Sequence, residues 1–234
     1  MSLGLSIPLY NEADSLPDTV RDLLAALDGI EASVVLVDNG SADSTPHIID
    51  TLAARHPQLS TLHLSVNAGY GGGILAGVRA LLAAPRPAEV IGWMWGDNQI
   101  DPTILPALYA RCLGGASLAK AQRTVRQDGR RRRLIATGYA AVMRAGMGVE
   151  TPDVNGCPKL FRREVLSELA LSSEDWFLDA EAILKLEAAG LPVASEPAVM
   201  RPRLQGESKV RWQTVAEFIV NLVRVSRGRA PRAG

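Results

Sequence analysis

Short apolar runs that alternate with helical patterns constrain the fold of this chain more than any other feature of its sequence. Four strand-like runs rich in aliphatic and β-branched residues lie at residues 3–8, 34–38, 59–64 and 90–94. Helical periodicity follows the first three runs, at residues 16–27, 45–54 and 74–82. This alternation predicts an α/β fold with a mostly parallel central sheet. The glycine-rich residues 67–73 are predicted to form a turn before the third helix.

The pattern after residue 102 is less regular. We predict strands at residues 118–121 and 193–196, a turn at 153–156, and helices at 136–144, 163–169, 178–189 and 211–226. Residues 227–234 have the composition of a disordered tail. With 234 residues and no internal repeats, the chain is predicted to form one domain over residues 1–226.

Composition excludes some classes of partner and location. The 25 Lys and Arg residues balance 25 Asp and Glu residues, so we expect no general nucleic-acid binding. The only cysteines, Cys112 and Cys157, lack metal-ligand spacing, which favours free thiols in a reducing, cytoplasmic compartment. The first apolar run is too short for a signal peptide, and no run approaches the roughly 20 residues that span a bilayer. Any membrane association is therefore expected to be peripheral.

Polar residues directly follow three of the predicted strands, at residues 8–12, 38–43 and 97–101. In open α/β sheets, ligands bind in the crevice at the carboxyl ends of the strands. For Ser41 and Asp43 we favour the alternative that they serve only as turn formers and helix caps. For Asp38 and Asp97, which come immediately at strand ends, we favour a binding site.

The acidic run WGDNQIDP at residues 95–102 gives the most specific chemical signal. It follows the apolar run 90–94, which places its carboxylates in that crevice. An Asp with a second oxygen ligand nearby suits a hard cation that also binds phosphates. The sequence therefore predicts metal-assisted nucleotide chemistry.

Ordered motifs over nearly the whole chain resemble the inverting family 2 glycosyltransferases, which have the GT-A fold, a three-layer α/β sandwich. The motifs are IPLYNE at 7–12, VDNGSADST at 37–45, GDNQIDP at 96–102, FLDAE at 177–181 and RLQGESK at 203–209. The last two are similar to the closing motifs of the branch that contains dolichyl-phosphate mannose synthase and the polyprenyl-phosphate glycosyltransferases. This resemblance implies a nucleotide-binding half at residues 1–102 and an acceptor-binding half at 103–226.

The resemblance also implies which residues bind the nucleotide sugar. They are Pro8, Tyr10, Glu12, Asp38, Asn67 and Gly71, together with Asp97 and Gln99. The Asp38 carboxylate is expected near the base or ribose, from which it accepts hydrogen bonds. Glycines let the backbone approach a ligand, although the glycines at 71–73 are equally explained as a flexible turn.

The family's acidic motif usually reads Asp-x-Asp, and its second Asp and a following Gln lie near the metal. Here Trp95 stands at the first position. Asp97 and Gln99 remain candidate ligands for Mg²⁺ or Mn²⁺, with the donor pyrophosphate and water completing an octahedron. Trp95 is a candidate wall for the donor sugar.

Inverting transfer places growing negative charge on the leaving pyrophosphate, which a metal and arginine side chains can stabilise. The resemblance implies phosphate contacts from a family loop matched here by Arg203, Ser208 and Lys209, and acceptor-phosphate contacts from Arg123 and Arg133. The alternative for both stretches is a solvated charged surface.

The need for a general base depends on the acceptor. A phosphate acceptor is already an anion and requires only positioning. A hydroxyl acceptor needs a carboxylate, for which Asp179 or Glu181, and with less weight Asp153, are candidates. Asp179 and Glu181 are two positions apart, so they diverge on a regular helix, and both can instead serve as helix-start charges.

The predicted helix at residues 211–226 has an apolar stripe and arginines at its ends. We favour packing on its own domain over contact with a membrane surface. We expect an enzyme that transfers a sugar from a UDP-, GDP- or dTDP-linked donor to a polyprenyl phosphate. The alternatives are a transferase for a soluble small-molecule acceptor and a nucleotide-binding module without activity.

Overall fold

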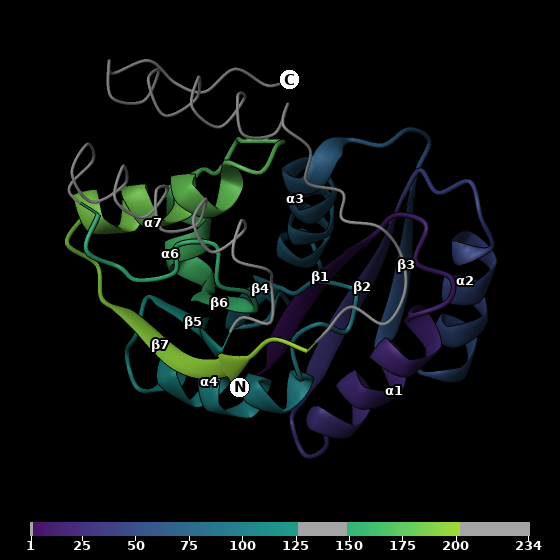
Figure 1. Ribbon diagram of the computed structural model, residues 1–234, viewed down its shortest axis with the longest axis horizontal. Helices are drawn as coiled ribbons and strands as arrows, with labels where there is room; N and C mark the ends of the chain where they lie inside the picture. Colours follow the sequence, from purple (N-terminus) through teal and green to yellow (C-terminus); the bar gives the residue numbers. More distant parts are fainter. Residues whose placement is uncertain (1, 126–148, 202–234) are drawn as a thin grey trace.

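The computed structural model describes residues 2–125 and 149–201. Within these ranges seven strands form one sheet in the order β3-β2-β1-β4-β6-β5-β7 (Figure 1). The strands are β1 (Leu3–Leu9), β2 (Ala32–Asn39), β3 (Leu59–Leu64), β4 (Val90–Trp93), β5 (Leu118–Val125), β6 (Lys159–Arg162) and β7 (Val193–Val199). The helices predicted at 136–144 and 211–226 and the tail 227–234 lie outside the described residues.

Helices cover both faces of this sheet. They are α1 (Leu16–Ala26), α2 (Thr45–Arg55), α3 (Gly69–Leu82), the short 3-10 helix η1 (Pro102–Ile104), α4 (Leu105–Leu113), α6 (Arg163–Leu169) and α7 (Leu178–Ala188). Helices α1, α2 and α4 lie on one face, and α3, α6 and α7 lie on the other (Figure 1). The sheet is thus the middle of three layers, as predicted.

The register of the parallel strands brings the predicted polar junctions together. In the parallel pair β1 and β2, Leu9 lies beside Asp38, and β3 continues the same edge with His63 beside Asp38. Strand β4 pairs with the other side of β1 and ends at Trp93, beside Ser6. The strand ends that precede all three polar junctions therefore point to the same edge of the sheet.

Three described elements were not predicted from the sequence: the short helix η1, strand β6 and helix α4. Strand β6 inserts antiparallel between β4 and β5, and it begins with a fully buried lysine, Lys159. Charged residues at both ends of this four-residue strand, Lys159 and Arg162, obscured its apolar character. Helix α4 was also missed, although its buried residues Leu105, Leu108, Tyr109 and Cys112 have helical spacing.

The predicted glycine-rich turn is wrong, because α3 already begins at Gly69. These glycines permit close approach. A Cβ atom on Gly71 would lie 2.2 Å from the Ser173 carbonyl oxygen, and one on Gly77 would lie 2.2 Å from Ser6 Oγ. Helix α3 therefore packs closer to β1 and to residues 173–175 than side chains would allow.

No helix in the two described ranges is long and apolar enough to cross a bilayer. The two cysteines, Cys112 and Cys157, are free thiols, as predicted, and both are buried.

Replacement of Gly77 by alanine tests this close packing. We expect Gly77→Ala to lower the free energy of unfolding by about 1–3 kcal/mol, because the new methyl group overpacks the α3–β1 contact despite the better helix propensity of alanine. Urea unfolding measures the change. Gly114→Ala is the control, since its Cβ meets no heavy atom nearer than 3.3 Å. Equal stability of the two variants would contradict the packing argument.

Candidate active site

The loops that follow β1 and β2 are joined by hydrogen bonds. The Asn11 amide donates to Ser41 Oγ (3.0 Å), and the Glu12 amide donates to Thr45 Oγ1 (3.0 Å). Asn11 has a left-handed backbone (φ 51°), which asparagine tolerates better than most residues. Asp43 accepts from the Thr45 amide (3.0 Å) and so has the helix-start role that the sequence favoured. These bonds fix the loop that contains Tyr10 and Glu12 against the loop after Asp38.

Asp38 is nearly buried, with 5% of its surface exposed. One carboxylate oxygen accepts from the Ser41 amide (2.9 Å), and the other lies 3.5 Å from His63 Nδ1. The second ring nitrogen of His63 lies 3.0 Å from an Asp50 oxygen. The hydrogen bond to Asp50 and the weaker one to Asp38 raise the pKa of His63. The Asp38 carboxylate is thus held in a defined orientation at the sheet edge.

Asn39 orders the loop between β3 and α3, a role that the sequence did not reveal. Its side-chain amide donates to the Gly69 carbonyl (2.9 Å), and its side-chain oxygen accepts from the Ala68 amide (2.9 Å). Asn67 contributes a further bond within the loop, from the Gly69 amide to its side-chain oxygen (2.9 Å). The structure therefore places Asn67 beside the end of β2, whereas Gly71 lies in α3 against residue 173.

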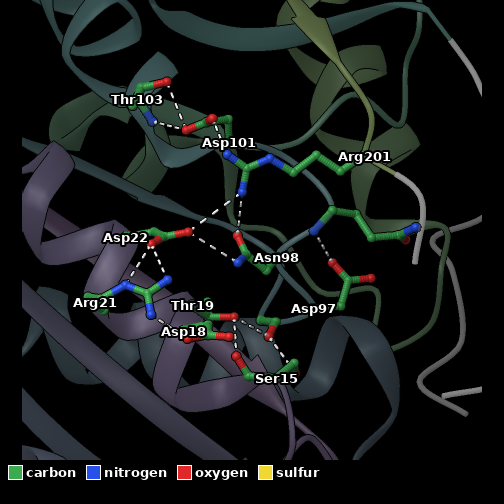
Figure 2. Close-up of polar contacts among 12 residues, drawn as sticks. Ser15, Asp18, Thr19, Arg21, Asp22, Asp97, Asn98, Asp101, Thr103 and Arg201 are labelled. Atoms are coloured by element: carbon green, nitrogen blue, oxygen red, sulfur yellow. Dashed lines mark hydrogen bonds and ion pairs between the residues drawn. The ribbon is translucent and has the colours of Figure 1, made fainter. Parts of the chain in front are cut away.

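The acidic loop follows β4 directly. Asp97 Oδ1 accepts from the Gln99 amide (3.2 Å), and Asn98 between them has a left-handed backbone (φ 53°). Figure 2 shows Asp97 apart from the group formed by Asp22, Asn98 and Arg201. Among the described residues, no three His, Cys, Asp or Glu side chains form a metal-binding group.

This small donor set fits a hard divalent cation that is bound largely by its ligand's phosphates. A carboxylate and an amide supply oxygen atoms, which Mg²⁺ and Mn²⁺ prefer. Magnesium sites commonly contain one or two carboxylates beside phosphates and water. Asp97 and Gln99 are therefore compatible with the predicted metal site, provided that a nucleotide contributes the remaining ligands.

Trp95 is oriented by a buried polar network. Its indole nitrogen donates to the Tyr70 hydroxyl (2.9 Å), which donates to Asp179 Oδ2 (3.0 Å). Lys159 Nζ lies 2.7 Å from the other Asp179 oxygen. Burial and the Asp179 charge raise the pKa of Tyr70 well above its usual value. Trp176 stacks on Tyr70 with ring centroids 4.2 Å apart, so the indole at the family's first Asp position is fixed by several contacts.

Arg123 lies beside Trp95. Its guanidinium is 5.6 Å from the centroid of the Trp95 ring and forms a two-point ion pair with Asp153, with distances of 2.6 and 2.9 Å. The side chains of Arg123 and Asp153 are only 12% and 8% exposed. The structure therefore brings one of the predicted acceptor-phosphate residues to the acidic loop. The second predicted acceptor-phosphate residue, Arg133, and the predicted phosphate contacts Arg203, Ser208 and Lys209 lie outside the described residues.

Asp179 and Glu181 diverge, as their spacing predicts. Asp179 faces Tyr70 and Lys159, whereas Glu181 accepts from the Ser173 amide (2.8 Å) and pairs with Lys185 (2.7 Å). Burial alone would raise the pKa of Glu181, but the bonds from Lys185 and Ser173 outweigh burial and lower it. These contacts give Glu181 a structural role at residues 172–173. General-base roles for both carboxylates stay predictions.

Two buried lysines, Lys120 and Lys159, support the site, and neither was predicted from the sequence. Lys159 pairs with Asp179, and Lys120 Nζ donates to the carbonyls of Pro152 (2.7 Å) and Asp153 (3.0 Å). Burial, followed by repulsion from Lys159, lowers the pKa of Lys120 to about 8. A lysine inside an apolar strand run was the available signal. Lys120 holds the backbone of the residue that binds Arg123.

The three-layer fold and the acidic loop at the end of β4 are the arrangement expected of a glycosyltransferase of the GT-A type. The chain belongs to glycosyl transferase family 2, whose model matches residues 5–170. The predicted family, fold and enzyme class are thereby confirmed.

Curated relatives match almost the whole chain. Undecaprenyl-phosphate mannosyltransferase of Micrococcus luteus is 29% identical over 227 residues, which cover 93% of this chain and 91% of that protein. Polyprenol monophosphomannose synthase of Mycolicibacterium smegmatis is 29% identical over 97% of this chain and 88% of that protein. These relatives agree with the predicted polyprenyl-phosphate branch.

Among solved structures, glucosyl-3-phosphoglycerate synthase from Mycobacterium tuberculosis, in complex with phosphoglyceric acid, has a TM-score of 0.70. It is 20% identical, and the match covers 98% of this chain and 81% of that one. This likeness establishes the fold alone. Another structure of that enzyme contains Mn²⁺, uridine diphosphate and phosphoglyceric acid.

The lowered pKa of Lys120 predicts a pH-dependent stability. Folded Lys120 loses its proton near pH 8, whereas the ordinary value is 10.5. Between these values the unfolded chain binds more protons, so folding becomes more favourable as the pH rises. We expect wild-type stability relative to Lys120→Met to increase by on the order of a few kcal/mol across this window. Urea unfolding of both proteins at several pH values measures the difference. Parallel stability curves would contradict the assignment.

Proposed function

We propose that this enzyme transfers a sugar, with inversion, from a nucleoside-diphosphate sugar to a polyprenyl phosphate, with Mg²⁺ or Mn²⁺ bound at Asp97. One observation supports a polyprenyl phosphate as the acceptor. Two bacterial proteins named for polyprenyl-type lipid acceptors align with 93% and 97% of this chain. The geometry of the sheet edge supports the donor and the metal.

The donor nucleotide is proposed to bind where the loops after β1, β2 and β3 meet. The proposed residues are Pro8, Tyr10, Glu12, Asp38, Asn67 and Gly71. The bonds of Asn11 and Asn39 hold these loops together, and Asp38 has a fixed carboxylate that can accept a hydrogen bond from a base or ribose. Preorganised loops of this kind lower the entropic cost of binding.

The leaving diphosphate is proposed to lie at the acidic loop. Asp97 and Gln99 would hold the divalent cation, which supplies Lewis-acid stabilisation of the charge that develops on the departing phosphate. Mg²⁺ and Mn²⁺ accompany UDP in structures of the mycobacterial synthase that shares this fold. Trp95 forms a rigid apolar wall two residues before Asp97, so the donor sugar can pack against its indole.

An anionic acceptor agrees with the charges around the site. A phosphate needs no general base, and the carboxylates considered for that role are all paired with cations: Asp179 and Glu181 with lysines, and Asp153 with Arg123. Arg123 supplies a cation beside Trp95, where an incoming phosphate would share the guanidinium with Asp153. Arg133, Arg203, Ser208 and Lys209 remain proposed phosphate contacts. Peripheral attachment through residues 211–226 and a cytoplasmic location also remain proposals.

Metal and nucleotide are expected to bind together. With one carboxylate and one amide as protein ligands, Mn²⁺ alone should bind weakly, whereas the correct nucleoside diphosphate should make binding tight. Thermal unfolding with UDP, GDP, dTDP and CDP, each with and without Mn²⁺, measures this coupling. A nucleotide at 100 times its dissociation constant stabilises a protein by about 2.7 kcal/mol. Tight Mn²⁺ binding without nucleotide would contradict the proposed donor set.

Transfer itself is tested with purified enzyme, labelled nucleotide sugars and polyprenyl phosphate in detergent. We expect product with the lipid phosphate and a loss of about 100-fold or more in Asp97→Asn, because even residues that only orient metal ligands contribute about 10–100-fold. Asp18→Asn, which changes an exposed carboxylate on α1, is the control and should retain full activity. Transfer only to a soluble phosphorylated acceptor would replace the proposed lipid substrate.

A further inference from the structure

The outer side of the acidic loop contacts a charged cluster that the proposed chemistry does not use. Asn98 donates from its side-chain amide to Asp22 (3.3 Å) and accepts from Arg201 Nη1 (3.3 Å). Arg201 Nη1 also lies 3.6 Å from Asp22, and Arg201 Nη2 pairs with Asp101. Figure 2 shows these four side chains converging on one point, apart from Asp97.

Backbone contacts join the same segments. The Arg201 amide donates to the Gln99 carbonyl (2.7 Å), and Ile100 forms an antiparallel bridge with Met200. Helix α1 binds the start of the loop, because Thr19 Oγ1 donates to the Gly96 carbonyl (3.2 Å). Residues 96–101 are therefore held from one side by α1 and from the other by the segment that follows β7.

The conformation of Asn98 explains why one side of the acidic loop contacts the charged cluster while the candidate metal ligands lie on the residues before and after it. Asn98 has a left-handed backbone between Asp97 and Gln99, and its side chain bonds to both Asp22 and Arg201. An asparagine costs less than most residues in this conformation, and here it also forms the two bonds that keep it there. Release of those bonds would let the two candidate metal ligands move.

We infer that Asp22, Asn98 and Arg201 are positioning residues that hold the acidic loop so that Asp97 and Gln99 face the metal and diphosphate. This inference rests on the proposed metal and donor at the loop. The ion pairs alone would contribute little to stability, because Arg201 is 39% exposed and Asp22 is 27% exposed. Their effect is on placement, since displacement of a ligating group by about 1 Å greatly weakens a preorganised site.

The first experiment compares nucleotide affinity with and without Mn²⁺ by calorimetry, using the nucleoside diphosphate that stabilises the wild-type protein. We expect Arg201→Met to weaken Mn²⁺-dependent binding about fivefold, the upper end for a partly exposed ion pair, and to leave Mn²⁺-free binding unchanged. Arg201→Lys should recover part of the loss, because it retains charge without the planar fork. Arg111→Met is the matched control, since Arg111 is also a partly exposed arginine in an ion pair, with Glu196 (2.5 Å) on β7.

A second pair of variants separates side-chain contacts from backbone strain. Asn98→Gly keeps access to the left-handed backbone and loses both side-chain bonds, whereas Asn98→Ala loses the bonds and is strained as well. We expect both to weaken Mn²⁺-dependent binding, with Ala the weaker binder. Wild-type affinity in Asn98→Gly would overturn the role of the side-chain bonds.

The other possible results of these experiments also show whether the cluster positions the loop. Equal weakening with and without Mn²⁺, or an equal effect of Arg111→Met, would mean that the cluster only stabilises the fold and would overturn it. Thermal unfolding identifies any variant that fails to fold, and Arg201→Lys then serves as the test. Transfer to polyprenyl phosphate is assayed separately, so an incorrect acceptor would leave the Mn²⁺-dependent comparison intact and the inference standing.

Discussion

The ion pair between Lys159 and Asp179 is the interaction on which the site depends. Both side chains are nearly inaccessible to water, so each charge would be costly without the other. Each partner also forms a further hydrogen bond: Lys159 donates to the Gly156 carbonyl, and Asp179 accepts from Tyr70. The pair therefore joins β6 and α7 to α3, and through Tyr70 to Trp95 at the start of the acidic loop.

The glycines of α3 allow the close packing that this network requires. Tyr70 lies one residue into α3, and the glycines that follow let the first turn of the helix approach residues 173–175. The same approach places Trp176 on the Tyr70 ring. The small residues on α3 thus make room for the large aromatic residues around it, which would not fit against larger side chains.

The sequence predicted β1, β2 and β4 well because each is a largely apolar run buried between two helical layers. It also predicted that the polar residues after β1, β2 and β4 gather at one edge, which follows from parallel topology alone. It did not predict β6, whose position depends on pairing with distant strands and whose first residue is a buried lysine. Nor did it reveal the contact of Asn98 with Arg201, because spacing carries no information about residues so far apart in the chain.

The reciprocal bonds between the loops after β1 and β2 constrain the lengths of these loops during evolution. The Asn11 amide donates to Ser41, and the Ala42 amide donates back to the Asn11 side chain (2.8 Å). An insertion in either loop would shift one partner and break both bonds together. At the proposed donor site, new preferences are therefore more accessible through exchange of side chains at constant loop length than through the length variation common in surface loops.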